Sequence, residues 1–129
     1  MEPTWLLRET VLTLHEQSLA LFGGLAGIRD EVMLDSALKR PEDLWYYSKP
    51  TLPELSASYA FGLAKNHPFF DGNKRIAFLA AVTFLEVNGR RFKGSEVEAI
   101  LNTLALAAGE LDEKGFAAWL EVSSTAPTS

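Results

Sequence analysis

The segment of residues 67–75, His-Pro-Phe-Phe-Asp-Gly-Asn-Lys-Arg, concentrates most of the chemistry of the chain. It brings a histidine, a carboxylate, a glycine, a carboxamide and two cations into consecutive positions. The segments on either side, residues 55–64 and 76–85, are apolar with helical periodicity. The polar segment is therefore predicted to be a short loop that leads into the N-terminus of a helix.

Such a loop is suited to bind an anion. Pro68 biases His67 away from helical backbone angles, so the first helix should end there. Gly72 allows a close backbone approach to a ligand. The first turn of the second helix has unpaired N–H groups and a positive dipole end, to which Lys74 and Arg75 add full charges. The expected ligand is a phosphate, with His67 placed beside it as a base.

Each of these residues taken singly also fits ordinary loop structure. Asp71 could be an N-cap, and His67 could simply bond to the backbone. Their joint presence in one short segment favours a site. The other histidine, His15, lies within a predicted helix, and we interpret it as a core or boundary residue that holds a neighbouring loop.

Composition narrows the possible classes of protein. A chain of 129 residues with 47% hydrophobic residues is expected to form one domain with a substantial core. A net charge of −5 argues against direct binding of nucleic acid. The lack of cysteine and the presence of only two histidines exclude thiolate chemistry and a structural zinc site. With no signal peptide and no long apolar run, we expect a cytoplasmic protein that does not enter a membrane.

The elements expected to position the loop are about six helices in a compact all-α bundle. They should begin near residues 8, 31, 52, 73, 96 and 113, and end at Gly23, Pro41, His67, Asn88, Gly109 and residue 122. The helix of residues 73–88 is apolar on most faces, which predicts that it is the central helix. The helix that begins near residue 96 is expected to be buried. Residues 1–122 should form a single domain, followed by a disordered tail of residues 123–129.

Residues 42–50 are the least regular internal segment and contain Trp45, Tyr46 and Tyr47 in succession. They are expected to form a loop or a short hairpin. Aromatic side chains in a loop can belong to the core or to a surface that binds another chain. The sequence leaves both interpretations open, and we hypothesise that a hairpin here is a flap that docks a target segment beside His67.

The segment of residues 67–75 resembles the signature of the Fic/Doc family, His-Pro-Phe-x-Asp/Glu-Gly-Asn-Gly-Arg. Similarity to the Doc, or death-on-curing, branch extends over residues 8–121. It includes Leu14-His15, Phe22-Gly23-Gly24, Gly27-Ile28-Arg29, residues 37–41 and Asn88-Gly89. The resemblance implies the Fic/Doc-like helical fold.

Two positions of the signature, 72 and 74, and position 78, which lies three residues after it, distinguish the branches. Lys74 stands where the adenylyl-transferring branch has glycine, and Phe78 stands where that branch has a second arginine; both are features of Doc-like toxins. Gly72 stands where the Doc prototype has alanine. The resemblance implies a toxin of a toxin–antitoxin module that uses ATP to phosphorylate a threonine of elongation factor Tu and so arrests translation. The alternatives are a protein adenylyl transferase and a non-catalytic helical module that binds an anion.

The resemblance also implies roles for individual residues. His67 would be the general base, and Asp71 would hold Mg²⁺ against the phosphates of ATP or orient His67. Lys74 and Arg75 would neutralise phosphate charge during transfer.

The remaining residues of the segment would shape the nucleotide site. Phe69 would be buried and anchor the loop, while Gly72 and Asn73 would form the anion hole. Doc-like toxins are held inactive by the C-terminal segment of an antitoxin. The chain has no stretch of the self-inhibitory Ser/Thr-x-x-x-Glu-Gly/Asn type, so control by a partner in trans is expected.

Overall fold

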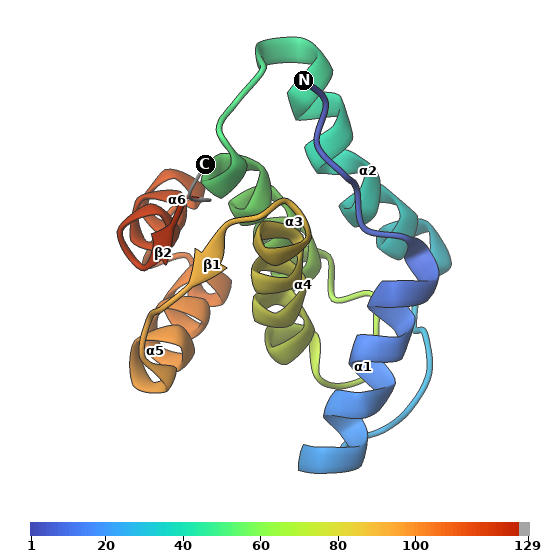
Figure 1. Ribbon diagram of the computed structural model, residues 1–129. Helices are drawn as coiled ribbons and strands as arrows, with labels where there is room; N and C mark the ends of the chain where they lie inside the picture. The colour runs from blue at the N-terminus through green and yellow to red at the C-terminus, as the bar shows by residue number, and fades with distance from the viewer. Residues whose placement is uncertain (127–129) are drawn as a thin grey trace.

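The computed structural model describes residues 1–126, which form six helices and one small sheet (Figure 1). The helices are α1 (Arg8–Phe22), α2 (Glu31–Ser48), α3 (Leu52–Asn66), α4 (Asn73–Val87), α5 (Glu96–Ala108) and α6 (Glu113–Val122). Strand β1 (Arg91–Phe92) pairs antiparallel with β2 (Ser124–Thr125), with Arg91 opposite Thr125. The predicted all-α architecture is confirmed.

The helix at the centre of the bundle is α3. It packs against α2, α4, α5 and α6, and 10 of its 15 residues are buried, compared with 7 of 15 in α4. The prediction of a central apolar helix is therefore confirmed, but its assignment to residues 73–88 is wrong. The small side chains along α3 let neighbouring helices approach on several sides, whereas one face of α4 remains partly exposed.

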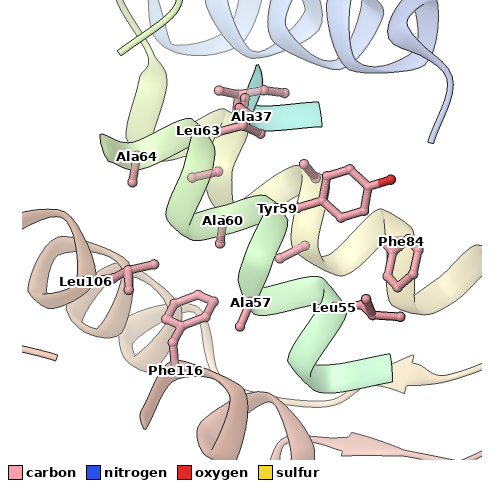
Figure 2. Close-up of a cluster of buried hydrophobic side chains, with 14 of the residues drawn as sticks. Ala37, Leu55, Ala57, Tyr59, Ala60, Leu63, Ala64, Phe84, Leu106 and Phe116 are labelled. Carbon is pink, nitrogen blue, oxygen red and sulfur yellow. The ribbon is translucent and has the colours of Figure 1, made fainter. Parts of the chain in front are cut away.

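Close packing around α3 is visible in Figure 2, where Ala57 and Ala60 lie near Leu106 of α5 and Phe116 of α6. At Gly62, an added Cβ would lie only 3.1 Å from the Cα of Ala37. Such a distance is tighter than most contacts of a real Cβ atom, and the neighbouring atom is backbone, so α2 and α3 pack closely here.

Helix α2 does not stop at Pro41, as the sequence predicted. It continues to Ser48 and is closed by Lys49, whose backbone is left-handed and donates its N–H to the carbonyl of Trp45 at 3.0 Å. A proline inside a helix lacks one N–H. Burial of Pro41 in the core and the packing of Trp45 against that core outweigh this loss.

Because residues 42–48 are helical, the expected hairpin flap is not formed. The start of α2 lies beside the loop that contains His67, and α2 then runs away from it (Figure 1). At about 1.5 Å per residue, Trp45 lies roughly 20 Å along the helix from its first turn. The hypothesis that this segment docks a target beside His67 is therefore wrong.

Two further expectations differ from the structure. Val97, Ile100, Leu101 and Leu104 of α5 are 45–66% exposed, so the outer face of this helix is not buried as expected. Residues 124–125, assigned to a disordered tail, form β2; residues 127–129 lie outside the described residues. The backbone of residues 124–125 pairs with that of β1, and a hydropathy pattern does not predict such a pairing.

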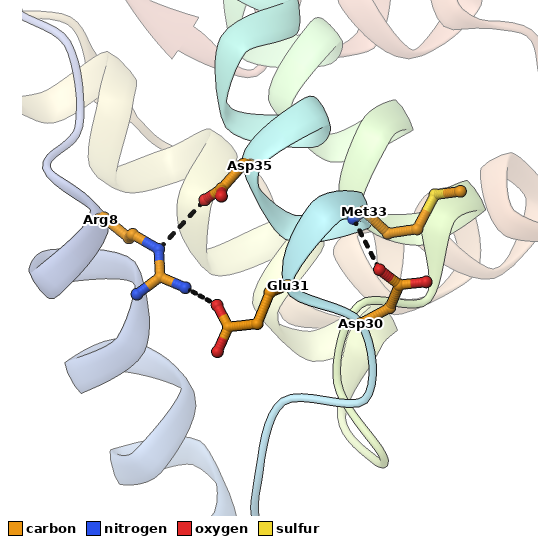
Figure 3. Close-up of polar contacts among 5 residues, drawn as sticks. All are labelled: Arg8, Asp30, Glu31, Met33 and Asp35. Carbon is orange, nitrogen blue, oxygen red and sulfur yellow. Dashed lines mark hydrogen bonds and ion pairs between the residues drawn. The ribbon is translucent and has the colours of Figure 1, made fainter.

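Polar contacts fix the start of α2 relative to α1 (Figure 3). The guanidinium of Arg8 bonds to Glu31 and, at 3.1 Å, to Asp35. The Asp30 carboxylate accepts a hydrogen bond from the Met33 N–H at 3.1 Å and caps the helix, whose start near residue 31 agrees with the prediction. Among residues 1–126, no helix combines the length and apolar character needed to cross a membrane.

Candidate functional site

The predicted loop lies between the C-terminus of α3 and the N-terminus of α4. His67 is the residue that ends α3, and its side chain is exposed. Its backbone is left-handed, with φ 49° and ψ 54°, a conformation that is costly for a residue other than glycine. Gly72, with φ 77°, precedes the first turn of α4. The loop therefore begins and ends where the sequence predicted, but the left-handed conformation of His67 was not foreseen, because a residue before proline is biased towards extended angles.

The carboxamide of Asn73 closes the loop from inside. Its Oδ1 accepts a hydrogen bond from the Phe69 N–H, and its Nδ2 donates to the Phe69 carbonyl, both at 3.0 Å. Nδ2 also lies 3.5 Å from Nδ1 of His67. The Asn73 side chain thus holds the loop backbone and touches the histidine ring. Its N–H groups are directed to these two partners, so any contribution of Asn73 to an anion hole would come from its backbone N–H.

His15 supports the loop from α1. Its ring stacks on Phe69 with centroids 3.7 Å apart, and its Nε2 lies 2.7 Å from the carbonyl oxygen of Asp71. This contact requires a proton on Nε2. His15 is therefore a buried residue that holds a neighbouring loop, as the sequence analysis interpreted it. Phe69 is 1% exposed and anchors the loop in the core; the predicted contact with a nucleotide remains a prediction.

The carboxylate of Asp71 is exposed at the tip of the loop. Its Oδ2 accepts a hydrogen bond from the Leu25 N–H at 2.7 Å. Among residues 1–126, no group of three or more His, Cys, Asp or Glu side chains could hold a metal ion. A lone carboxylate fits Mg²⁺ only if nucleotide phosphates and water supply the other ligands, and that is how this ion commonly binds beside ATP.

The two cations of the segment have different surroundings. Lys74 is exposed, and no hydrogen bond or ion pair of its Nζ is found among residues 1–126. Arg75 donates to the Gly23 carbonyl at 2.9 Å, and its guanidinium lies 5.3 Å from the centre of the Phe22 ring. Arg75 is thus tied to the end of α1, whereas Lys74 can move toward a ligand.

Gly72 suits its surroundings. A Cβ added there would lie 3.2 Å from the Arg75 guanidinium and 3.4 Å from Nε2 of His15. The same backbone has a positive φ of 77°, which a residue with a side chain adopts only at a cost. A side chain at this position would therefore strain the backbone and require the ends of the Arg75 and His15 side chains to shift by a few tenths of an ångström.

Two cavities meet at the loop. A groove of about 920 Å³ crosses the exposed face of α4, and a smaller cavity of about 490 Å³ lies beside α5. His67, Lys74 and Leu104 line both. The groove is also lined by Asp71, Gly72, Asn73, Arg75, Phe78, Leu79, Val82, Ile100 and, at its two sides, Ser18 and Thr103. The predicted site residues other than buried Phe69 are thus brought together along one surface.

Sequence reasoning did not foresee how the connection between α1 and α2 supports the loop. Besides the contacts of Gly23 and Leu25, Arg29 donates from Nε to the His67 carbonyl at 2.7 Å and from Nη2 to the Asn66 carbonyl at 3.0 Å. An arginine after a glycine-rich turn has no periodic signature, so its partners could not be inferred from sequence spacing.

The loop places an exposed imidazole and two cationic side chains at the N-terminus of a helix, an arrangement suited to an anion. Comparison with known proteins identifies the family. Residues 5–85 match the model of the Fic/DOC family, and the chain belongs to that family.

Two curated relatives are similar over most of their length. The chain is 39% identical over 125 residues to Toxin Doc of Mycolicibacterium smegmatis, covering 88% of this chain and 94% of that protein. It is 35% identical over 104 residues to Protein kinase doc of Escherichia phage P1, covering 80% of this chain and 82% of the relative.

Proposed function

We propose that the chain is a Doc-type toxin that transfers the terminal phosphate of ATP to a hydroxyl group of a translation factor, with a threonine of elongation factor Tu as the expected acceptor. The observation that carries the proposal is the position of exposed His67 beside Lys74, where two cavities meet. The name of one relative, Protein kinase doc, supports the same chemistry.

In this reaction the acceptor oxygen forms a bond to the γ-phosphorus, while the bond between that phosphorus and the bridging oxygen of ADP breaks. The imidazole of His67 accepts the hydroxyl proton as the oxygen attacks. Lys74 and the backbone N–H groups at the start of α4 stabilise the charge on the phosphoryl oxygens. Asp71 would hold Mg²⁺, which supplies further charge neutralisation when bound.

The surroundings of Phe78 favour phosphoryl transfer over adenylyl transfer. Its ring packs edge-on against Phe92 with centroids 5.4 Å apart, and lies 6.3 Å from the ring of Trp119. The position is therefore part of an aromatic cluster that links α4 to β1 and α6. Phe78 therefore supplies no cation to hold a phosphate, as the second arginine of the adenylyl-transferring branch would. Lys74 provides the mobile positive charge instead.

The decisive experiment is to incubate the protein with purified elongation factor Tu and ATP labelled separately at the α- and γ-phosphates. We expect only the γ label to be transferred, with a mass gain of about 80 Da for phosphoryl transfer rather than about 329 Da for adenylyl transfer. Transfer of the α label would identify an adenylyl transferase. Binding of ATP without transfer of either label to any protein of a ribosome-depleted translation extract would favour a non-catalytic module.

The groove over α4 is suited to hold the controlling segment of an antitoxin. Exposed Ile100 and Leu104 of α5 form an apolar wall on one side of the groove. Leu79 and Val82 of α4 also line the groove. Because the same groove contains His67, a segment bound along it would cover the site.

Two buried hydroxyl groups on the sides of this groove support the same partner. Ser18 of α1 and Thr103 of α5 are 3% and 4% exposed, and their hydroxyls find no hydrogen-bond partner among residues 1–126. Buried hydroxyls are normally paired. A partner segment with an apolar face and a few polar groups would both bury the apolar wall and satisfy these hydroxyls.

This partner site can be tested with two apolar positions of similar exposure. Ile100 is 55% exposed and lines the groove, whereas Val87 is 50% exposed and does not. In cells that also produce an antitoxin able to neutralise the wild-type chain, Ile100→Glu should escape neutralisation and Val87→Glu should not. Equal neutralisation of both variants would place the partner elsewhere.

A further inference from the structure

The connection between α1 and α2 runs along the loop of the site as an additional backbone layer. The N–H groups of Arg29 and Asp30 both donate to the Pro68 carbonyl, at 2.7 and 3.1 Å. The N–H of Phe70 donates to the Gly27 carbonyl at 3.2 Å. These bonds form an isolated antiparallel bridge between Ile28 and Phe69. Arg29 is therefore fixed by its own backbone directly beside the histidine.

The Arg29 side chain returns to the same point. Its guanidinium donates to the carbonyls of Asn66 and His67, the last residue of α3 and the residue that caps it. A positive group is favourable at the negative end of a helix dipole. No ion pair joins Arg29 to an acidic side chain among residues 1–126. Its charge is thus directed to the two carbonyls that precede the loop.

This clamp acts on a residue with a strained backbone. His67 has φ 49°, and a residue with a side chain leaves the left-handed region readily unless neighbouring groups hold it there. A change of φ or ψ at His67 would turn its Cα–Cβ bond and move the whole imidazole. Within residues 1–126, the one hydrogen-bond contact of its ring is that with Asn73 at 3.5 Å, which is long for a hydrogen bond. Control of the ring direction must therefore come mainly through the backbone.

We propose that Arg29 is a positioning residue that holds the His67 backbone in its left-handed conformation and so aims the imidazole at the acceptor hydroxyl. The proposal rests on the proposed function of His67 as a base. It assigns to Arg29 no contact with ATP or with the target. Its loss should lower kcat and leave the KM for ATP nearly unchanged, because only the placement of the base changes.

The test uses Arg29→Ala, Arg29→Lys and the control Arg8→Ala. Arg8 also joins α1 to α2 through two carboxylates (Figure 3), but within residues 1–126 its side chain makes no hydrogen bond or ion pair with residues 66–72. We expect Arg29→Ala to lower kcat at least about 10-fold with a KM for ATP within about twofold of wild type, since a small misplacement of a reacting group costs up to about 100-fold. Arg29→Lys keeps a charged donor but lacks the two guanidinium N–H groups that bond to both carbonyls. Its kcat should therefore lie between those of Arg29→Ala and wild type. A kcat of Arg29→Ala within twofold of that of Arg8→Ala would overturn the proposal.

A second measurement does not depend on activity. The chain has only two histidines, so ring-labelled histidine gives two sets of NMR signals, and His67→Ala identifies which set belongs to His67. In Arg29→Ala and Arg29→Lys, the His67 signals should shift or broaden while those of His15 stay in place. Shifts of both histidines together, or of neither, would contradict positioning by Arg29. If the wild-type protein modifies no target, the proposed function fails, but this comparison still tests the role of Arg29.

Discussion

The carboxamide of Asn73 allows a prediction with an internal control. Asn88, at the other end of α4, holds the backbone of a single residue in the same way: its Oδ1 accepts from the Thr4 N–H at 2.7 Å, and its Nδ2 donates to the Thr4 carbonyl at 3.0 Å. Asn73 makes the equivalent pair of bonds to Phe69. Replacing either asparagine with alanine removes this pair of bonds, and Asn88→Ala also removes the bond from Nδ2 to the Phe84 carbonyl at 2.9 Å. Only the replacement of Asn73 affects the site.

The expected loss of stability follows from these bonds. Asn73→Ala loses two hydrogen bonds and Asn88→Ala loses three, each with a net contribution of about 1 kcal/mol. At Phe69 the N–H and the carbonyl then lie beside a buried site without a partner, which adds roughly 1–2 kcal/mol. We therefore expect Asn73→Ala to lower the free energy of unfolding by about 3–4 kcal/mol, and Asn88→Ala, whose partner Thr4 is exposed, by about 3 kcal/mol. The two variants are thus similar in stability and differ in their effect on the site.

Urea denaturation measures the stability of both variants, and γ-label transfer to elongation factor Tu measures their activity. At a temperature where both remain folded, Asn73→Ala should lose at least about 10-fold in kcat, because the loop and the His67 ring lose their support. Asn88→Ala should retain nearly all activity. If the two variants lose activity in the same proportion, the effect is one of general stability and our account of Asn73 is refuted.

Three further predictions concern the site and the core. His67→Ala should lower phosphate transfer by roughly 10²–10⁴-fold with little change in melting temperature, because the side chain is exposed; near-normal transfer would exclude it as the base. Lys74→Gly should sharply reduce γ-label transfer without creating α-label transfer, because Phe78 still contributes no cation; unchanged γ transfer would show that Lys74 is not needed. Burial raises the pKa of Tyr59 to about 12, above that of an unfolded tyrosine near 10, so stability should fall by roughly 2–3 kcal/mol as the pH rises from about 10 to 12. Urea denaturation across this pH range measures the fall in stability. In Tyr59→Phe, the part of that fall caused by ionisation of Tyr59 should disappear.

Local sequence signals predicted the helices well where capping residues mark the ends. The order Thr51-Leu52-Pro53-Glu54, for example, is typical of a capping box: the Thr51 hydroxyl accepts from the Glu54 N–H while the Glu54 carboxylate accepts from the Thr51 N–H. The signals failed where tertiary packing decided the outcome. Pro41 looked like a helix stop, but its burial against the core keeps α2 continuous. The apolar periodicity of α5 predicted burial, although the face with Ile100 and Leu104 borders a groove.

The residues gathered along the groove were predictable from the sequence, but most of their support was not. The order of residue types from His67 to Arg75 predicts an anion site next to a base, and the structure brings these residues, other than buried Phe69, to one surface. The spacing does not specify how the loop folds, so it could not show that the Asn73 carboxamide bonds to the loop backbone. The hydrogen bonds of His15 and Arg29 join residues 37 to 56 positions apart in the chain. The sequence suggested that His15 holds a neighbouring loop, but no local pattern encodes which residues these two side chains contact.

The same long separations set the order in which the site can form during folding. Residues 67–72 have few bonds among themselves and are held by groups from α1, from the connection that follows it and from Asn73 of α4. A chain that has folded only α3 and α4 would therefore carry the complete segment of residues 67–75 without its working geometry. Closing loops of this length is entropically slow compared with forming a helix. A nascent chain should thus acquire its active loop as a late event, when α1 docks on α4, and an isolated peptide of the segment should be inert.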